Sequence, residues 1–203
     1  MAGYSLAMSA LPPSDPSLAK QDLRVKMRAV VNNLSAGHRA AASARARGQL
    51  EQKAVWQNAH SVLLFAPMHD EPDIWLLLSS ALKSGKVVAL PRFDAATDAY
   101  SAAQIKNPAR DTREGRFGVR EPAGSCPPVP LNRLDFVLVP GVAFDLRGRR
   151  LGRGKGYFDR LLAAVRGTKC GVAFDEQIVT EIPFEPHDVL VNCILTPMRW
   201  FDI

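Results

Sequence analysis

The stretch Val139–Leu162, VPGVAFDLRGRRLGRGKGYFDRLL, indicates a strand, a glycine-rich loop and a helix in succession. An apolar, strand-like run ends at its start, and a helical pattern begins at Tyr157. Between them lie five cations within residues 147–155 and three alternating glycines, Gly152, Gly154 and Gly156. Glycines let backbone N–H groups approach a ligand closely, and cations supply the opposite charge to an anion. The pattern predicts an anion-binding loop at a helix N-terminus, with phosphate as the expected ligand.

This loop differs from the two common phosphate motifs. A P-loop has the form G-x-x-x-x-G-K-[ST], but Arg149 stands at the first glycine position and Gly156 stands where Ser or Thr would bind magnesium. The dinucleotide fingerprint G-x-G-x-x-G also fails, because Tyr157 replaces the third glycine. A glycine-rich surface turn with solvated arginines is the alternative interpretation. The neighbouring aromatic pair and Asp159 favour a binding site instead.

Outward from this stretch, apolar strand-like runs alternate with helical patterns. The predicted strands are 61–66, 87–90, 136–139, 170–174 and 189–195, and the predicted helices are 17–34, 35–58 with Ser35 as N-cap, 73–83 and 157–165. Such alternation is typical of a parallel sheet covered on both faces. We therefore predict an α/β fold: a single three-layer α/β/α domain over residues 17–203 with a mostly parallel central sheet. Residues 94–133 are predicted to be long excursions with a few short strands.

The expected ligand site follows from the same pattern. In open parallel sheets, ligands bind beyond the carboxyl ends of the strands. The loops after Ala66, Leu90, Val139, Phe174 and Leu195 should therefore form one rim.

Bulk properties narrow the class of protein. The 203 residues, 47% of them hydrophobic, suffice for one core, and no apolar run approaches the ~20 residues that span a bilayer. Residues 1–16 are expected to be a flexible tail without signal or transit features. Cys126, Cys170 and Cys193 show no C-x-x-C spacing, so neither a disulfide framework nor a zinc site is indicated, and a reducing cytoplasm is expected.

The formal net charge of +6 favours an anionic partner, which charge alone leaves open between nucleic acid, a nucleoside triphosphate and a polyanionic small molecule. The predicted helix 35–58 carries a basic face of Arg39, Arg45, Arg47 and Lys53. No aromatic residues alternate with these charges, so a solvated helix face is the preferred interpretation over a nucleic-acid surface.

The decamer LGRGKGYFDR resembles the signature LGRGxGYYDR of the 5-formyltetrahydrofolate cyclo-ligase family. The segments VLVPGVAFD, GVREP and LPR, an N-terminal K-x-x-L-R (Lys20, Leu23, Arg24) and a downstream P-x-x-x-H-D (Pro183, His187, Asp188) follow in the family's order, so the resemblance covers about residues 17–196. It implies ATP-dependent conversion of 5-formyltetrahydrofolate to 5,10-methenyltetrahydrofolate, with release of ADP and phosphate. It also implies Mg²⁺ as cofactor, ATP and reduced folate (polyglutamylated forms included) as partners, and a cytoplasmic monomer that binds neither nucleic acid nor membrane.

The resemblance also implies roles for individual residues. Lys155 and Arg153, which flank Gly154, are the expected catalytic cations, and Asp159 and Asp188 are the expected metal ligands. The expected ATP-binding residues are Lys20, Arg24, Arg150, Gly152, Arg153, Gly154, Lys155, Gly156, Tyr157 and Phe158. The expected substrate-binding residues are Ala66, Glu71, Phe117, Arg153 and Tyr157. A Glu71 carboxylate suits the N–H donors of a pterin edge, and aromatic faces suit a flat heterocycle.

Two departures and several alternatives accompany this hypothesis. Phe158 replaces the second Tyr of the signature, and Phe117 stands where some relatives carry Trp. The cations could be surface charges, and Asp159 and Glu71 could be ordinary acids at helix starts. His187 is expected to be structural. For the whole chain, the alternatives are a non-catalytic nucleotide- or folate-binding relative and a basic nucleic-acid-binding protein.

Overall fold

An eight-stranded sheet in the order β13-β12-β10-β7-β1-β2-β3-β6 forms the centre of the structure, a computed structural model that describes residues 15–203 except the side chain of Phe117. The five strands from β12 to β2 run parallel, and β13, β3 and β6 add antiparallel edges. The strands are β1 (Ser61–Leu63), β2 (Val87–Asp94), β3 (Ala99–Ile105), β6 (Pro128–Val129), β7 (Phe136–Pro140), β10 (Thr168–Val172), β12 (Cys193–Leu195) and β13 (Trp200–Asp202). The predicted α/β fold with a mostly parallel sheet is confirmed.

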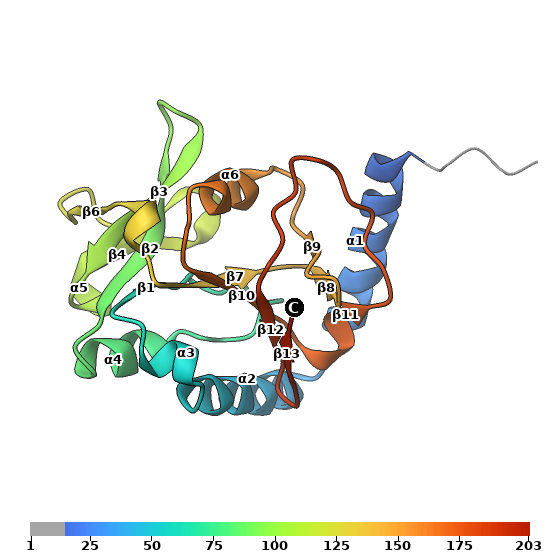
Figure 1. The fold of residues 1–203 in the computed structure, drawn as a ribbon, viewed down its shortest axis with the longest axis horizontal. Coiled ribbons are helices and arrows are strands. Elements are labelled where there is room, and N and C mark those ends of the chain that lie inside the picture. The colour runs from blue at the N-terminus through green and yellow to red at the C-terminus, as the bar shows by residue number, and fades with distance from the viewer. Residues whose placement is uncertain (1–14) are drawn as a thin grey trace, which may run out of the picture.

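Helices cover both faces of this sheet (Figure 1). On one face lie α2 (Ala36–Glu51), α3 (Ala54–Gln57) and α4 (Leu76–Lys83), and on the other lies α6 (Tyr157–Ala163). Side chains alternate between the two cores as strand geometry requires: Val62 and Leu138 join the first, whereas Leu63 and Val137 join the second with Leu161 of α6. Within residues 15–203, no helix has the length and apolar character needed to cross a membrane.

Helix α1 (Pro16–Asn32) packs beside a small sheet of β8 (Ala143–Asp145), β9 (Arg150–Leu151) and β11 (Ile178–Val179). Met27 of α1 contributes to a separate small core with residues of this sheet. The Asp15 side chain caps the helix by accepting from the Ser17 N–H at 2.9 Å. Helix α1 therefore begins at Pro16, one residue before the predicted helix start, because proline suits the first helical position. The predicted tail otherwise falls on residues 1–14, which lie outside the described part.

The predicted helix 35–58 is wrong in its continuity. Ser35 is its N-cap as predicted, accepting from the His38 N–H at 3.1 Å. However, α2 ends at Glu51 and Lys53 is extended (φ −82°, ψ 131°) before α3 begins. The break allows Trp56 to turn into the core, where its ring meets Phe136 edge-on at 5.6 Å. Tertiary burial thus overrides local helix propensity here.

Other boundaries also differ from the prediction. The strand predicted from residue 189 begins at Cys193, the helix predicted from residue 73 begins at Leu76, and the strand predicted to end at residue 90 continues to Asp94. Asp98, with φ 47°, turns β2 back into β3, a seven-residue strand of the main sheet inside the predicted excursion. The rest of that region holds α5 (Pro108–Asp111), η1 (Arg116–Gly118), η2 (Leu131–Arg133) and a separate hairpin of β4 (Thr112–Glu114) and β5 (Arg120–Pro122).

The cations of the basic face predicted for helix 35–58 contact other segments of the chain. Arg39 donates to the Leu34 carbonyl at 2.6 Å, and Arg47 donates to the Asp73 carbonyl. Arg45 approaches the Met198 sulfur at 3.5 Å, and Lys53 lies over the Trp200 ring at 5.0 Å. These cations thus fasten α2 and the chain after it to neighbouring segments.

Close packing against the sheet predicts the effect of one glycine substitution. A Cβ on Gly171 would lie 2.5 Å from Cε1 of the buried Phe144 ring. We expect Gly171→Ala to lower the free energy of unfolding by about 1–3 kcal/mol, measured by urea denaturation, because the ring has no space to yield. Gly48→Ala, at a mid-helix position with nothing within 4 Å, should instead stabilise by about 0.5–1 kcal/mol. A Gly171 variant as stable as the wild type would contradict this packing argument.

Candidate active site

A cavity of about 310 Å³ lies at the carboxyl edge of the parallel strands. Its walls come from the chain after β1, from β2 and the end of β7, from the loop 152–156 with the start of α6, and from β5. Only three of the five loops of the predicted rim thus border this cavity. Ala66, Pro91 and Pro140 line the cavity, whereas the loops after Phe174 and Leu195 line a separate depression beside α2.

The glycine-rich loop leads into α6, as the sequence predicts, but β8 and β9, which lie between β7 and this loop, were not predicted. Gly154 and Gly156 have φ of 102° and 64°, which side-chain-bearing residues rarely adopt, and Gly156 is the residue before the first turn of α6. Gly152 serves a different purpose, because a Cβ there would lie 2.8 Å from Nη1 of Arg150. Lys155 is exposed and lines the cavity. The loop conformation therefore depends on all three glycines.

Arg150 is a buried cation in the cavity wall, with 4% of its side chain exposed. Its Nη2 donates to Oδ1 of Asp159 at 2.8 Å, and its Nη1 donates to the Pro140 carbonyl at 3.2 Å. The centre of the Phe158 ring lies 5.9 Å from Cζ of the same guanidinium. These contacts fix the end of β7, the glycine-rich loop and the first turn of α6 relative to one another.

Arg153 joins the glycine-rich loop to the chain after β1. Its Nε and Nη2 donate to Oε1 of Glu71 at 3.2 and 2.9 Å, and Nη2 also donates to Asp70. Oε2 of Glu71 accepts from the Met68 N–H at 2.9 Å. Burial raises the pKa of Glu71, although the Arg153 charge and the Met68 hydrogen bond act in the opposite direction. Both Glu71 oxygens therefore already have donors within the protein, a pairing that the sequence did not reveal.

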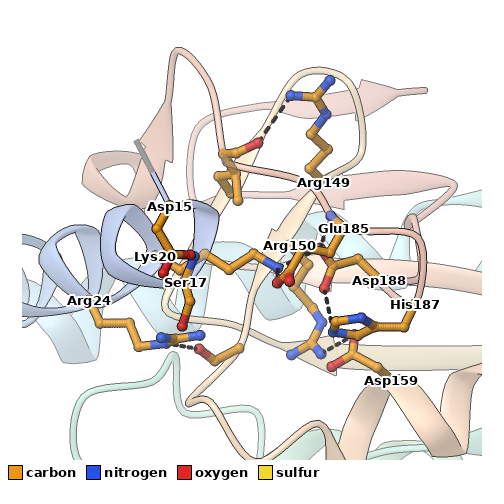
Figure 2. Close-up of polar contacts among 12 residues, drawn as sticks. Asp15, Ser17, Lys20, Arg24, Arg149, Arg150, Asp159, Glu185, His187 and Asp188 are labelled. Atoms are coloured by element: carbon orange, nitrogen blue, oxygen red, sulfur yellow. Dashed lines mark hydrogen bonds and ion pairs between the residues drawn. The ribbon is translucent and has the colours of Figure 1, made fainter. Parts of the chain in front are cut away.

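Helix α1 brings Arg24 to the glycine-rich loop and Lys20 to the segment 185–188 (Figure 2). Arg24 Nε donates to the Gly152 carbonyl at 2.8 Å. Lys20 Nζ lies 2.8 Å from Oε2 of Glu185 and 2.6 Å from Oδ2 of Asp188. Burial alone would lower the pKa of Lys20, but the hydrogen bonds and charges of the two carboxylates outweigh it and raise that pKa.

The two predicted metal ligands have different protein partners. Asp159 belongs to the cavity wall and binds Arg150, whereas Asp188 binds Lys20 and accepts from the Glu185 N–H at 2.8 Å. Glu185, His187 and Asp188 offer ligand atoms within 4.8 Å of one another. Glu185 was not predicted from the sequence, and His187 was predicted to be structural, yet the His187 side chain is 69% exposed.

Aromatic side chains from two segments form one side of the cavity. Tyr157 packs edge-on against Phe93 and Tyr100, at centroid distances of 5.3 and 5.6 Å, and its hydroxyl donates to Oδ1 of Asp98 at 2.9 Å. Phe93, Tyr100 and Asp98 were missed because the β2–β3 hairpin was not predicted. The backbone of Phe117 lies in η1, but its side chain is outside the described part.

A parallel sheet with a cationic glycine-rich loop at its carboxyl edge, beside an aromatic-walled cavity, defines an α/β protein built to bind a phosphorylated ligand next to a flat one. The chain belongs to the 5-formyltetrahydrofolate cyclo-ligase family, whose sequence profile matches residues 16–197.

Named relatives agree with this assignment. The chain is 37% identical to the 5-formyltetrahydrofolate cyclo-ligase of Mycolicibacterium smegmatis over 70% of this chain and 76% of that one. It is 29% identical to the Mus musculus 5-formyltetrahydrofolate cyclo-ligase over 87% and 93%. The solved structure of Aquifex aeolicus 5,10-methenyltetrahydrofolate synthetase superimposes with a TM-score of 0.82 at 34% identity, covering 90% of this chain and 92% of that one.

The Lys20 cluster gives a prediction about stability. Lys20→Met leaves the Glu185 and Asp188 carboxylates together without their cation, so we expect a loss of about 1–3 kcal/mol in unfolding free energy at pH 7. Lys26→Met, at an exposed position of the same helix, is the control. Urea denaturation of both variants measures the loss. A Lys20 variant as stable as the wild type would contradict the electrostatic account.

Proposed function

We propose that this protein converts 5-formyltetrahydrofolate to 5,10-methenyltetrahydrofolate at the cavity described above, consuming ATP and releasing ADP and phosphate. The observation that carries this proposal is the composition of the cavity wall. One part carries the cations Arg150, Arg153 and Lys155, and another carries the aromatic rings of Tyr100 and Tyr157. A triphosphate and a flat heterocycle can therefore meet within one site.

The proposed chemistry needs a phosphoryl group next to the formyl oxygen. Transfer of the γ-phosphoryl group to that oxygen activates the formyl carbon, N10 of the folate then attacks this carbon, and phosphate leaves. Phosphoryl transfer depends mainly on positioning and on compensation of negative charge. Lys155 suits the second task, because its side chain lines the cavity and it lies between the two glycines of positive φ.

Arg153 and Glu71 are proposed to act as a unit toward the folate. The ion pair with Glu71 uses Nε and Nη2 of Arg153; among the described residues, none accepts from Nη1. Oε2 of Glu71 has one donor and can accept a second. In this arrangement Glu71 orients Arg153 and offers one oxygen to a pterin N–H, while Ala66 and Tyr157 border the same space.

Mg²⁺ is the proposed cofactor, and the carboxylates suit it chemically. Magnesium takes hard oxygen ligands and commonly uses one or two carboxylates besides phosphate oxygens and water. Asp159 offers Oδ2, which accepts from no described residue, and Asp188 offers Oδ1, whose one ion pair among the described residues is with His187 at 3.8 Å. When bound, the ion would neutralise charge on the ATP phosphates. We place the enzyme in the cytoplasm as a monomer, acting on free and polyglutamylated folates, without nucleic-acid or membrane partners.

The direct test is turnover by the purified protein. Appearance of the methenyl product from 5-formyltetrahydrofolate, followed by absorbance, should require both ATP and Mg²⁺. Binding of both ligands without any product would identify a non-catalytic relative instead.

Lys155→Ala should lower turnover by about 10²-fold or more, because it removes a cation of the cavity wall that would compensate the charge that develops during transfer. Lys83→Ala, an exposed lysine at the end of α4, should leave turnover unchanged. Steady-state assays measure the turnover of both variants. A Lys155 variant within threefold of the wild type would remove this residue from the mechanism.

Asp159→Asn and Asp188→Asn should each raise the Mg²⁺ concentration needed for half-maximal activity, since each replaces an anionic oxygen ligand by a neutral one. Asp22→Asn, at an exposed position of α1, provides the control. Magnesium titrations at saturating ATP measure the shift. Identical titration curves for all variants and the wild type would refute the two-aspartate site.

A further inference from the structure

Glu121 is a buried acid of the cavity to which the sequence analysis gave no role. It lies in β5, within the GVREP segment, and is 7% exposed. It lines the same cavity as Glu71 and Arg153. Oε2 accepts from the Phe93 N–H at 3.1 Å, whereas Oε1 is buried and has no hydrogen-bond partner among residues 15–203. A buried polar atom without a partner costs about 1–3 kcal/mol, so an unpaired oxygen in a binding cavity calls for a reason.

The surrounding backbone makes room for this carboxyl group. A Cβ on Gly115 would lie 2.4 Å from Cδ and 2.8 Å from Oε1 of Glu121. Gly115 has φ −103°, which any residue adopts, so its backbone conformation does not require glycine. The absence of a side chain instead lets the Glu121 carboxyl lie against the β4–β5 hairpin. Glycine, carboxyl and the Phe93 N–H thus form a fixed polar position on the β5 side of the cavity.

The charges around Glu121 leave this position without a strong counterion. Burial raises the pKa of Glu121, while the Phe93 hydrogen bond and the more distant Arg113 charge lower it. By contrast, Oε1 of Glu71 in the same cavity accepts twice from Arg153. Of these two cavity acids, Glu121 is therefore the one with an oxygen to which the protein supplies no donor.

We propose that Glu121 is a substrate-binding residue whose Oε1 accepts an N–H group of the reduced pterin ring. The proposal rests on the proposed function, because that function supplies a ligand with several ring N–H donors and a 2-amino group. Glu71 and Glu121 then act together: Glu71 orients Arg153 and offers Oε2 to the heterocycle, and Glu121 accepts from a further N–H group of the same ring. Phe93 positions the carboxyl through its backbone, independently of its side chain.

The sharpest test is Glu121→Gln. The Phe93 N–H requires an acceptor, so the glutamine oxygen should take the place of Oε2 and its NH₂ group the place of Oε1. The amide would then present N–H to N–H. We expect affinity for 5-formyltetrahydrofolate, measured by calorimetry, to fall about tenfold to a hundredfold, with ATP affinity within about twofold and the melting temperature unchanged. Glu114→Gln, an exposed acid on the paired strand β4, should match the wild type.

A second variant tests the same carboxyl group without replacing Glu121. Gly115→Ala should displace it and reproduce the folate-selective loss, whereas Gly124→Ala, with open space around it, should not. Folate affinity of Glu121→Gln within threefold of the wild type, or equal loss of folate and ATP affinity, would overturn the proposal. If the wild-type protein binds ATP but no 5-formyltetrahydrofolate, the proposed function itself fails, and the assignment of Glu121 falls with it.

Discussion

The buried guanidinium of Arg150 is the constraint on which the site depends. It joins the carbonyl at the end of β7 to Asp159 in the first turn of α6, and so fixes both ends of the glycine-rich loop. This requires space as well as partners. A Cβ on Gly141 would lie 3.3 Å from Cγ of Arg150, and one on Gly152 would lie 2.8 Å from its Nη1. Glycines thus make room for the cation in addition to permitting unusual backbone angles.

Charge pairing explains why several cations can lie close together in this site without a large loss of stability. Burying an unpaired charge is expensive, and each deeply placed cation of the site has a carboxylate partner. Lys20 forms ion pairs with Glu185 and Asp188, Arg150 with Asp159, and Arg153 with Asp70 and Glu71. Lys155 differs, because it is exposed and appears in no described ion pair, as its proposed contact with a ligand phosphate requires. Preorganisation and free charge are therefore supplied by different residues.

The sequence was sufficient for features that depend on local pattern. Apolar runs located the central parallel strands, and glycine spacing with the adjacent cations located the loop now seen at the sheet's carboxyl edge. Features decided by distant contacts could not be predicted. The helix break before α3 follows from burial of Trp56, and the strand β3, AYSAAQI, has too many small residues for a clear alternating pattern. Partners such as Glu185 for Lys20 are separated by 165 residues and leave no local signal.

Under the proposed function, the β2–β3 hairpin matters more for ligand selection than its sequence suggested. It contributes Tyr100 to the aromatic side of the cavity, with Phe93 packed against that ring, an acceptor (Asp98) for the Tyr157 hydroxyl, and a backbone N–H to Glu121. A phosphate group needs only cations and backbone amides, which one continuous loop can supply. A heterocycle needs flat surfaces and hydrogen-bonding groups on several sides, and these have to come from separate segments. The phosphate-binding half of such a site is consequently readable from sequence, whereas the half that selects the heterocycle emerges only from the fold.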